Sequence, residues 1–183
     1  MSTCTAFADQ NIIARGTLAE VAVALASRAG SVLVIDDQTG RPFDLDLRGD
    51  RADITARYSG PSTESVRAGR GRPKLGVIPR EVTLLPRHWD WLNAQPGGAS
   101  AALRRLVEAA RRDNAGQDAR RQAQDIAYSA LSALAGNLAD YEEALRAFYA
   151  DDAVRFEDLT RSWPADIRAY VLEKAMAVWT PVP

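Results

Sequence analysis

Residues 80–112, "REVTLLPRHWDWLNAQPGGASAALRRLVEAARR", contain a short β-prone run followed by two helix-prone runs. The run 80–85 predicts a strand, and Pro86, a residue favoured in the first turn of a helix, predicts that a helix begins directly after it. The turn "PGGAS" follows, and Ser100 is a suitable N-cap for a last helix whose apolar residues recur on one face. The segment therefore predicts a strand, a helix, a Gly-rich turn and a second helix.

This unit is too small to be stable alone. A single strand leaves its backbone hydrogen-bonding groups unpaired, and two short helices bury little apolar surface. We therefore expect a homodimer through residues 80–112, in which the two strands pair antiparallel about a two-fold axis. Such a pair of strands is a ribbon of the width that the DNA major groove admits.

In this order of elements, residues 80–112 resemble the ribbon-helix-helix repressors, the class of Arc and MetJ. The resemblance implies that Glu81 and Thr83 face base edges. It also implies that the turn at Gly98, Ala99 and Ser100 places helix amides against a phosphate. A helix N-terminus favours an anion through its free N–H groups and its dipole.

The phase of the predicted strand leaves two arrangements open. Val82 and Leu84 are the apolar residues of an alternating pattern, but Leu85 breaks its phase. In the first arrangement the strand ends at Leu84, and Leu85 packs against the first helix. In the second arrangement Glu81 and Thr83 point inward instead of toward DNA.

A basic segment, "GRGRPK" at 69–74, precedes the strand and resembles the AT-hook, whose Arg-Gly-Arg-Pro core lies in a narrow minor groove. Gly allows close approach to the groove floor, Pro keeps the chain extended, and Arg is attracted by the negative potential of A·T tracts. The matching residues are Arg70, Gly71, Arg72 and Pro73, with Lys74 next to them.

The charge distribution agrees with a polyanionic partner. Residues 67–112 carry ten basic side chains against three acidic ones, although the whole chain has a net charge of −1. A basic block between acidic flanks is typical of nucleic-acid binding. The residues predicted to contact DNA are Arg70, Gly71, Arg72, Pro73, Lys74, Arg80, Glu81, Thr83, Arg87, Ser100, Arg104 and Arg105.

Residues 1–58 predict a small α+β domain with the element order ββαββ. Thr17 and Glu20 form a capping box at the start of the helix, and Gly30 is expected to end it. The run 31–49 predicts a hairpin with its turn at Thr39-Gly40. In its second strand Asp44 and Asp46 alternate with apolar residues, which is typical of a solvent-facing side, so we expect no metal site.

The remaining chain predicts a linker and a helical region. Residues 59–79 are rich in Gly, Ser and Pro and are expected to be a flexible, basic linker. Residues 113–183 predict an all-helical domain, with a stop at Gly136-Asn137 and a cap at Asp151 or Asp152. Five aromatic residues fall on the apolar helix faces and are expected in the core: Tyr141, Phe148, Phe156, Trp163 and Tyr170.

The composition limits the chemistry that the chain can perform. The 183 residues include one cysteine and one histidine, so no Cys/His metal cluster can form. Cys4 is expected to be a buried apolar residue, and His88 a surface residue in the first turn of a helix. No catalytic or cofactor-binding motif is present, so we expect neither an enzyme nor a cofactor. No apolar run is long enough to span a membrane, and the cytoplasm is the expected location.

Over nearly its whole length the chain also resembles a bacterial family of uncharacterised proteins. That resemblance carries no known activity. We expect a dimeric bacterial transcriptional regulator that places a β-ribbon in the major groove and a basic arm in the minor groove. The alternative is an interaction protein without DNA, similar to an antitoxin, in which residues 80–112 dimerise and the acidic C-terminal helices bind another protein.

Overall fold

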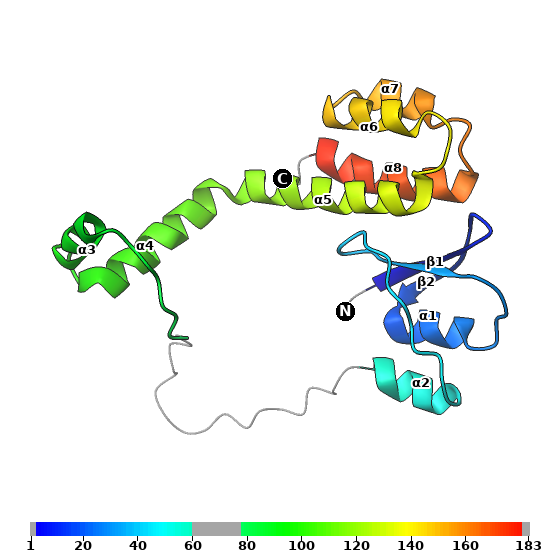
Figure 1. Ribbon diagram of the computed structural model, residues 1–183, viewed down its shortest axis with the longest axis horizontal. Coiled ribbons are helices and arrows are strands. Elements are labelled where there is room, and N and C mark those ends of the chain that lie inside the picture. Colours follow the sequence, from blue (N-terminus) through cyan, green and yellow to red (C-terminus); the bar gives the residue numbers. More distant parts are fainter. Residues whose placement is uncertain (1–2, 60–77, 181–183) are drawn as a thin grey trace. The chain divides into compact units, whose positions relative to one another are not determined.

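The computed structural model describes residues 3–59 and 78–180, and the chain forms two compact units (Figure 1). One unit is discontinuous and contains Met1–Ser62 together with Gln117–Pro183, whereas Thr63–Gly116 forms the other. The described residues form a three-stranded antiparallel sheet and eight helices, which is a mostly helical α+β fold. The α+β class predicted from the sequence is therefore confirmed. None of the helices in this part of the chain is long and apolar enough for a membrane span.

The sheet has the order β2-β1-β3. β1 (Thr3–Ala8) lies in the centre and pairs antiparallel with both β2 (Asn11–Thr17) and β3 (Leu33–Asp36). The chain reverses between β1 and β2 through Asp9 and Gln10, which have φ values of 47° and 69°. This pair of left-handed residues makes the tight turn whose twist matches that of the two strands.

Helix α1 (Leu18–Leu25) begins as the sequence predicts but ends early. The Thr17 hydroxyl accepts from the Glu20 amide and the Glu20 carboxylate accepts from the Thr17 amide, so the capping box is confirmed. The prediction that Gly30 ends the helix is wrong, because its C-cap is Ala26. Packing of an apolar face supplies most of a helix's stability, and the buried face of α1 has its last member at Leu25.

The prediction of a fourth strand in the N-terminal region is wrong. After the turn at Thr39-Gly40, pairing with β3 is limited to a bridge between Ile35 and Pro42 and to the Phe43 amide, which donates to the Val34 carbonyl. Farther along, the Asp46 amide donates to the Tyr58 hydroxyl over 2.6 Å instead of to a strand. The order of elements in this region is therefore ββαβα and not ββαββ.

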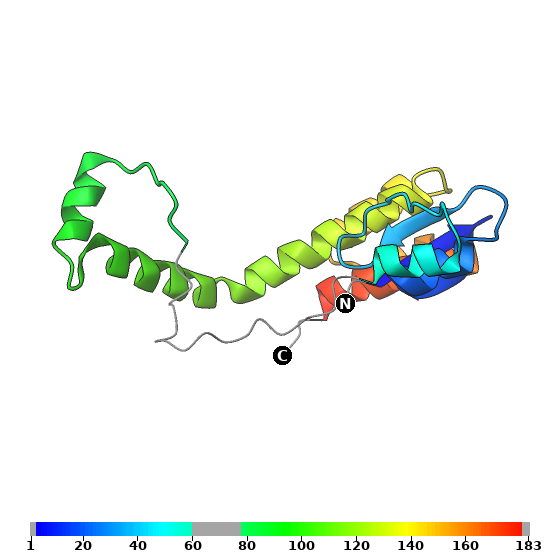
Figure 2. The same cartoon turned by 90° about the horizontal axis from the view of Figure 1, so that it is seen from below.

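The last element of that order, α2 (Arg51–Tyr58), is a helix that was not predicted. Asp50 is its N-cap, and Asp50 and Asp53 exchange the two hydrogen bonds of a capping box. Arg57 donates to the carbonyls of Asp46 and Arg48 over 2.7 and 3.0 Å, so α2 side chains bind the backbone that precedes the helix. Helix α2 lies against α1 (Figure 2).

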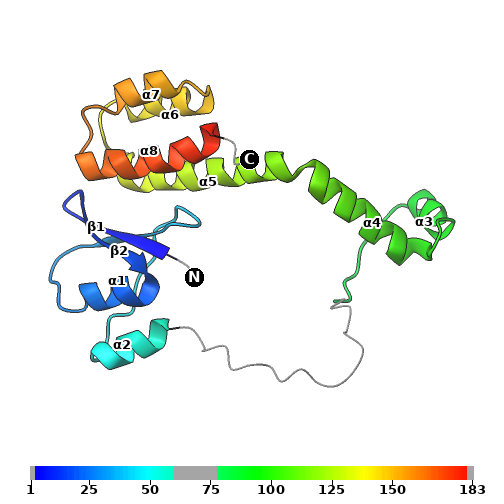
Figure 3. The same cartoon turned by 180° about the vertical axis from the view of Figure 1, so that it is seen from behind.

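The C-terminal region is helical, as predicted, and its helices are α5 (Ala115–Ala135), α6 (Tyr141–Tyr149), α7 (Ala153–Leu159) and α8 (Ala165–Trp179). Helix α5 ends directly before Gly136, and Asp152 caps α7 by accepting from the Arg155 amide. Figure 3 shows α5 and α8 between the sheet and the pair formed by α6 and α7.

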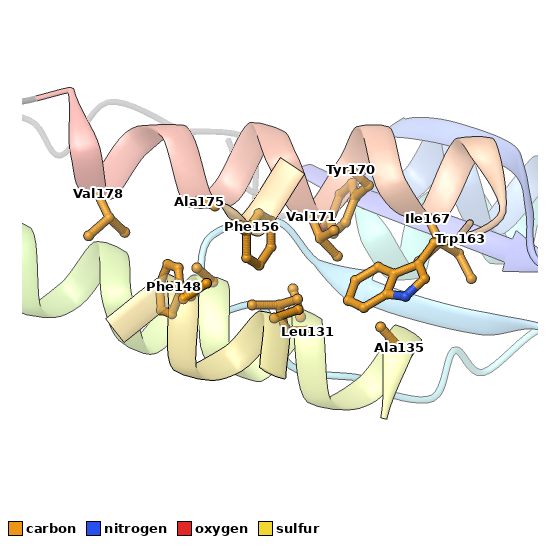
Figure 4. Packing of buried hydrophobic residues seen from close by; sticks show 14 of the residues in the cluster. Leu131, Ala135, Phe148, Phe156, Trp163, Ile167, Tyr170, Val171, Ala175 and Val178 are labelled. Carbon is orange, nitrogen blue, oxygen red and sulfur yellow. The ribbon is translucent and has the colours of Figure 1, made fainter. Parts of the chain in front are cut away.

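The sheet and the C-terminal helices share one hydrophobic core. Phe7 and Ile35 of the sheet belong to the same buried cluster as the side chains of α5 to α8. Figure 4 shows part of this cluster between α5 and α8. The predicted core aromatics are buried there, apart from Tyr141, which is partly buried against the cluster. The N-terminal and C-terminal regions, predicted as separate domains, therefore complete each other.

The described part of the smaller unit contains α3 (Pro86–Asn93) and α4 (Gly98–Asp113). Both helices were predicted, and Pro86 is the first residue of α3. Residues 78–85 have no regular structure, so the strand predicted over 80–85 is not formed in the single chain. A strand needs a neighbouring strand to complete its hydrogen bonds, and the described residues of this unit contain no other strand.

Candidate nucleic-acid interface

The turn between α3 and α4 begins the second helix three residues earlier than expected. The predicted N-cap Ser100 lies inside the first turn of α4, where it is exposed, and the N-cap is Gly97. Gly97 and Gly98 have φ values of 84° and 72°, a region that glycine enters without steric cost. The helix begins at Gly98 because these two glycines complete the reversal of the chain. No side chain caps the α4 N-terminus.

An apolar groove of about 250 Å³ lies between α3, α4 and the segment that precedes them. It is lined by Leu84, His88, Trp91, Leu92, Leu103 and Leu106. In the described part of this unit, residues 78–116, only Leu92 and Ala102 are buried. Large apolar side chains remain exposed in this part of the unit, and Trp91 and Leu106 among them line the groove: Ile78, Val82, Leu85, Trp91, Leu106 and Val107. The groove is an incomplete core.

The segment before α3 places its side chains unequally. Leu84 is half-buried in the groove, whereas Glu81 and Thr83 are exposed. Leu85 is the N-cap of α3, and its carbonyl accepts from the His88 amide over 2.8 Å. Leu85 itself has extended backbone angles (φ −68°, ψ 149°) and is 49% exposed, so it does not pack on the helix as the first arrangement requires. Because no strand forms here, the direction of Glu81 and Thr83 relative to DNA stays a prediction.

Helix α4 has two chemically different faces. Leu103, Leu106, Val107 and Ala110 lie at i, i+3, i+4 and i+7, the spacing of one helix face. Exposed arginines occupy the other side, namely Arg104, Arg105, Arg111 and Arg112. They lie in two pairs seven residues apart, which brings each pair to the same side of the helix two turns later.

Hydrogen bonds hold part of this basic face in place. Arg105 donates to the Pro96 carbonyl over 3.1 Å, and Arg112 donates to the Glu108 carbonyl over 3.2 Å. The Glu108 carboxylate accepts from Arg111 over 2.9 Å, which raises the pKa of Arg111 above its ordinary value. Because Glu108 already has a cationic partner, its repulsion of a polyanion is reduced.

The predicted DNA-contacting residues fall into two groups. Residues Arg70, Gly71, Arg72, Pro73 and Lys74 lie outside the described residues. The structure places the others in the smaller unit with exposed side chains, and they are Arg80, Glu81, Thr83, Arg87, Ser100, Arg104 and Arg105. Arg111 and Arg112 extend the same face but were not among the predicted residues. Their seven-residue spacing from Arg104 and Arg105 was the signal that could have identified them.

The described residues offer no cluster of three or more His, Cys, Asp or Glu side chains for a metal ion. Cys4 is fully buried, and this burial raises the pKa of its thiol to about 11. A thiol with this pKa is protonated at neutral pH, so Cys4 is a packing residue and a poor nucleophile. The only histidine, His88, is exposed at the wall of the apolar groove.

The chain belongs to a family of proteins conserved in bacteria, because a family model matches residues 3–175. The family is DUF2239, and its description is that of an uncharacterised protein. The bacterial family expected from the sequence is thereby confirmed. Comparisons with curated proteins and with solved structures gave no match.

Proposed function

We propose that this protein is a dimeric DNA-binding regulator whose smaller unit forms the DNA-contacting body. The observation that carries the proposal is the pairing of an incomplete apolar core with a basic helix face in one unit. The incomplete apolar core requires a partner that supplies apolar side chains. The basic helix face favours a polyanion on the side of α4 that the partner leaves free.

A second copy of the chain is the partner that fits the groove. The run 78–85 forms no strand in the single chain and carries three exposed apolar residues, Ile78, Val82 and Leu85. The same run from a second copy supplies both a strand for pairing and side chains for the groove. In this dimer Glu81 and Thr83 remain on the outer face of the ribbon, where they contact base edges in the major groove.

Phosphates are the proposed ligands of the basic face. Arg104, Arg105, Arg111 and Arg112 are exposed on the side of α4 that lies away from the groove. The N-terminal amides of α4 lack a side-chain cap and favour an anion. Arg80 and Arg87 add further charge before and at the start of α3. The basic arm, Arg70 to Lys74, is the proposed contact to A·T-rich minor grooves.

The alternative function is protein binding without DNA. It rests on the same groove, because a partner protein with an apolar helix face also completes the core. It gives no role to the basic side of α4 or to Arg70 and Arg72. DNA binding and its dependence on these arginines therefore separate the two functions.

The test is a titration of the full-length protein against mixed-sequence and A·T-rich duplexes at several salt concentrations. For the proposed function, log affinity falls linearly with log salt, with a slope of about −0.9 per phosphate contact. Replacing Arg70 and Arg72 by Ala is expected to lower affinity and the preference for A·T together. Replacing Arg104 and Arg111 by Ala should make the slope shallower by roughly 2 for all sequences.

Arg51→Ala is the matched control, because Arg51 is an exposed arginine of α2 in the other unit. Its affinity and salt slope should equal those of the unmodified protein. Absence of binding at about 50 mM salt, a concentration that favours phosphate contacts, would contradict DNA binding and favour a protein partner.

A further inference from the structure

The discontinuous unit contains a hollow of about 320 Å³ between the end of α1, β3 and the segment that follows β3. Its apolar lining comes from Leu25, Val32, Val34, Phe43, Leu45 and Leu47. A cavity of this size is at the lower end of the range for small-molecule sites. The hollow therefore has room for a small ligand.

The hollow lies where the expected hairpin fails to close. Phe43, Leu45 and Leu47 have the alternation of a strand, yet hydrogen bonding with β3 stops at Phe43. The Asp46 amide and carbonyl are bound by side chains of α2 instead, namely Tyr58 and Arg57. Departures from a locally consistent sequence pattern concentrate at functional sites.

The apolar lining is only partly covered by the protein. Val32, Phe43, Leu45 and Leu47 pack against a buried cluster that includes Leu25 and Val34, but all four retain exposed surface. Covering this surface with an apolar group removes it from water, and the free energy gained is proportional to the area. The lining therefore favours a ligand with an apolar side chain.

The rim of the hollow carries one positive and one negative side chain. Arg28 follows the end of α1, and Asp44 lies on the segment after β3. Both are exposed, and neither makes an ion pair with any residue that the structure describes. The other acidic residue nearby, Asp46, is already bound by Arg48 and Arg57. Arg28 and Asp44 are thus each available to a charged group of a ligand.

We propose that this hollow binds an α-amino acid with an apolar side chain. The carboxylate of the ligand pairs with Arg28, its ammonium group pairs with Asp44, and its side chain enters the apolar hollow. An Arg guanidinium suits a carboxylate because it can donate two parallel hydrogen bonds. The site makes no use of DNA or of the smaller unit, so it stands apart from the proposed function.

The proposal is tested by titrating the full-length, ¹⁵N-labelled protein with L-leucine and following amide chemical shifts. Two analogues separate the contributions: 4-methylpentanoate lacks the ammonium group, and 3-methylbutylamine lacks the carboxylate. We expect saturable shifts with leucine at the lining residues and about two- to fivefold weaker binding of either analogue. An exposed ion pair is worth up to roughly 1 kcal/mol, which corresponds to about a two- to fivefold change.

Substitutions at the rim provide the second half of the test. Arg28→Gln and Asp44→Asn should each weaken leucine binding about two- to fivefold, with unchanged thermal unfolding because both side chains are exposed. Arg51→Gln is the control and should bind leucine as the unmodified protein does. The proposal is overturned if leucine gives no saturable shift, if both rim variants bind normally, or if an analogue binds as tightly as leucine.

Discussion

The Tyr170 hydroxyl donates a 2.8 Å hydrogen bond to the Asp37 carboxylate and so connects α8 to the turn after β3. The same carboxylate accepts from the Thr5 hydroxyl over 2.9 Å, and the Lys174 amine lies 3.8 Å away. The Asp37 side chain is 8% exposed and that of Lys174 is 11% exposed, so solvent screens this group of charges weakly. The network joins residues of β1 and α8 that are far apart in the sequence.

Tyr170→Phe is expected to lower the free energy of unfolding by about 1–3 kcal/mol, because it removes a hydrogen bond to a buried carboxylate and keeps the ring. Urea denaturation followed by circular dichroism measures the change. Tyr149→Phe is the matched control, since Tyr149 is 53% exposed. An equal effect of the two substitutions would mean that the Asp37 network adds nothing to stability.

Gly40→Ala is expected to destabilise the discontinuous unit by at least about 2 kcal/mol, because a Cβ at this position would overlap the Ile126 carbonyl oxygen of α5 and the φ of 68° is unfavourable for alanine. Gly30→Ala separates the two effects. Gly30 also has a positive φ, of 111°, but a Cβ there would meet no atom within 4 Å. If Gly40→Ala and Gly30→Ala lower the free energy of unfolding equally, the steric contact between the turn after β3 and α5 adds nothing to the loss.

Stability should fall as the pH rises above about 9, through the thiol of Cys4. Burial raises the pKa of this thiol from its ordinary 9.0 to about 11 in the folded state. The folded state therefore holds its proton more tightly, and its contribution to stability is complete below pH 9 and is lost as the pH approaches 11. Cys4→Ala should reduce this part of the pH dependence between pH 9 and 11 in urea denaturation. An unchanged profile in the variant would contradict the prediction.

Leu106→Glu should raise the dissociation constant of the proposed dimer at least about 100-fold, because it places an unpaired charge in the apolar groove of the smaller unit. Sedimentation equilibrium of the unmodified protein and the variant measures this constant. Val154→Glu is the control, since Val154 is 74% exposed in α7. A monomeric unmodified protein at high micromolar concentration would rule out the dimer.

The features that the sequence predicts correctly are those controlled by nearby residues. Thr17 and Glu20 meet across one helical turn, and Pro86 has a backbone suited to a first helical residue, so both helix starts could be read locally. Asp50 and Asp53 form the same kind of capping box. This signal predicts the start of α2 if Asp, as well as Glu or Gln, is accepted at the third helical position. The apolar face of α4 likewise follows from the spacing of its apolar residues alone.

The features that the sequence does not predict depend on distant partners. Nothing near Pro42 indicates that Tyr58 and Arg57 will bind the backbone at Asp46, so alternation alone suggested a strand. The shared core requires Phe7 to meet Tyr170, whose ring centroid lies 5.3 Å from that of Phe7. Contacts over such separations leave no periodic pattern. The strand predicted over 80–85 is a similar case, because its proposed partner is another chain.

The discontinuous unit also has a consequence for protein synthesis. The Ile12 amide of β2 donates to the Asp166 carboxylate of α8, over 2.7 Å and 154 positions along the chain. The sheet leaves the ribosome first but cannot cover Phe7 and Ile35 until α8 has been translated. Long-range closure of this kind slows folding and prolongs the exposure of unpaired strands. During translation the apolar side of the nascent sheet therefore stays exposed until the C-terminal helices are complete.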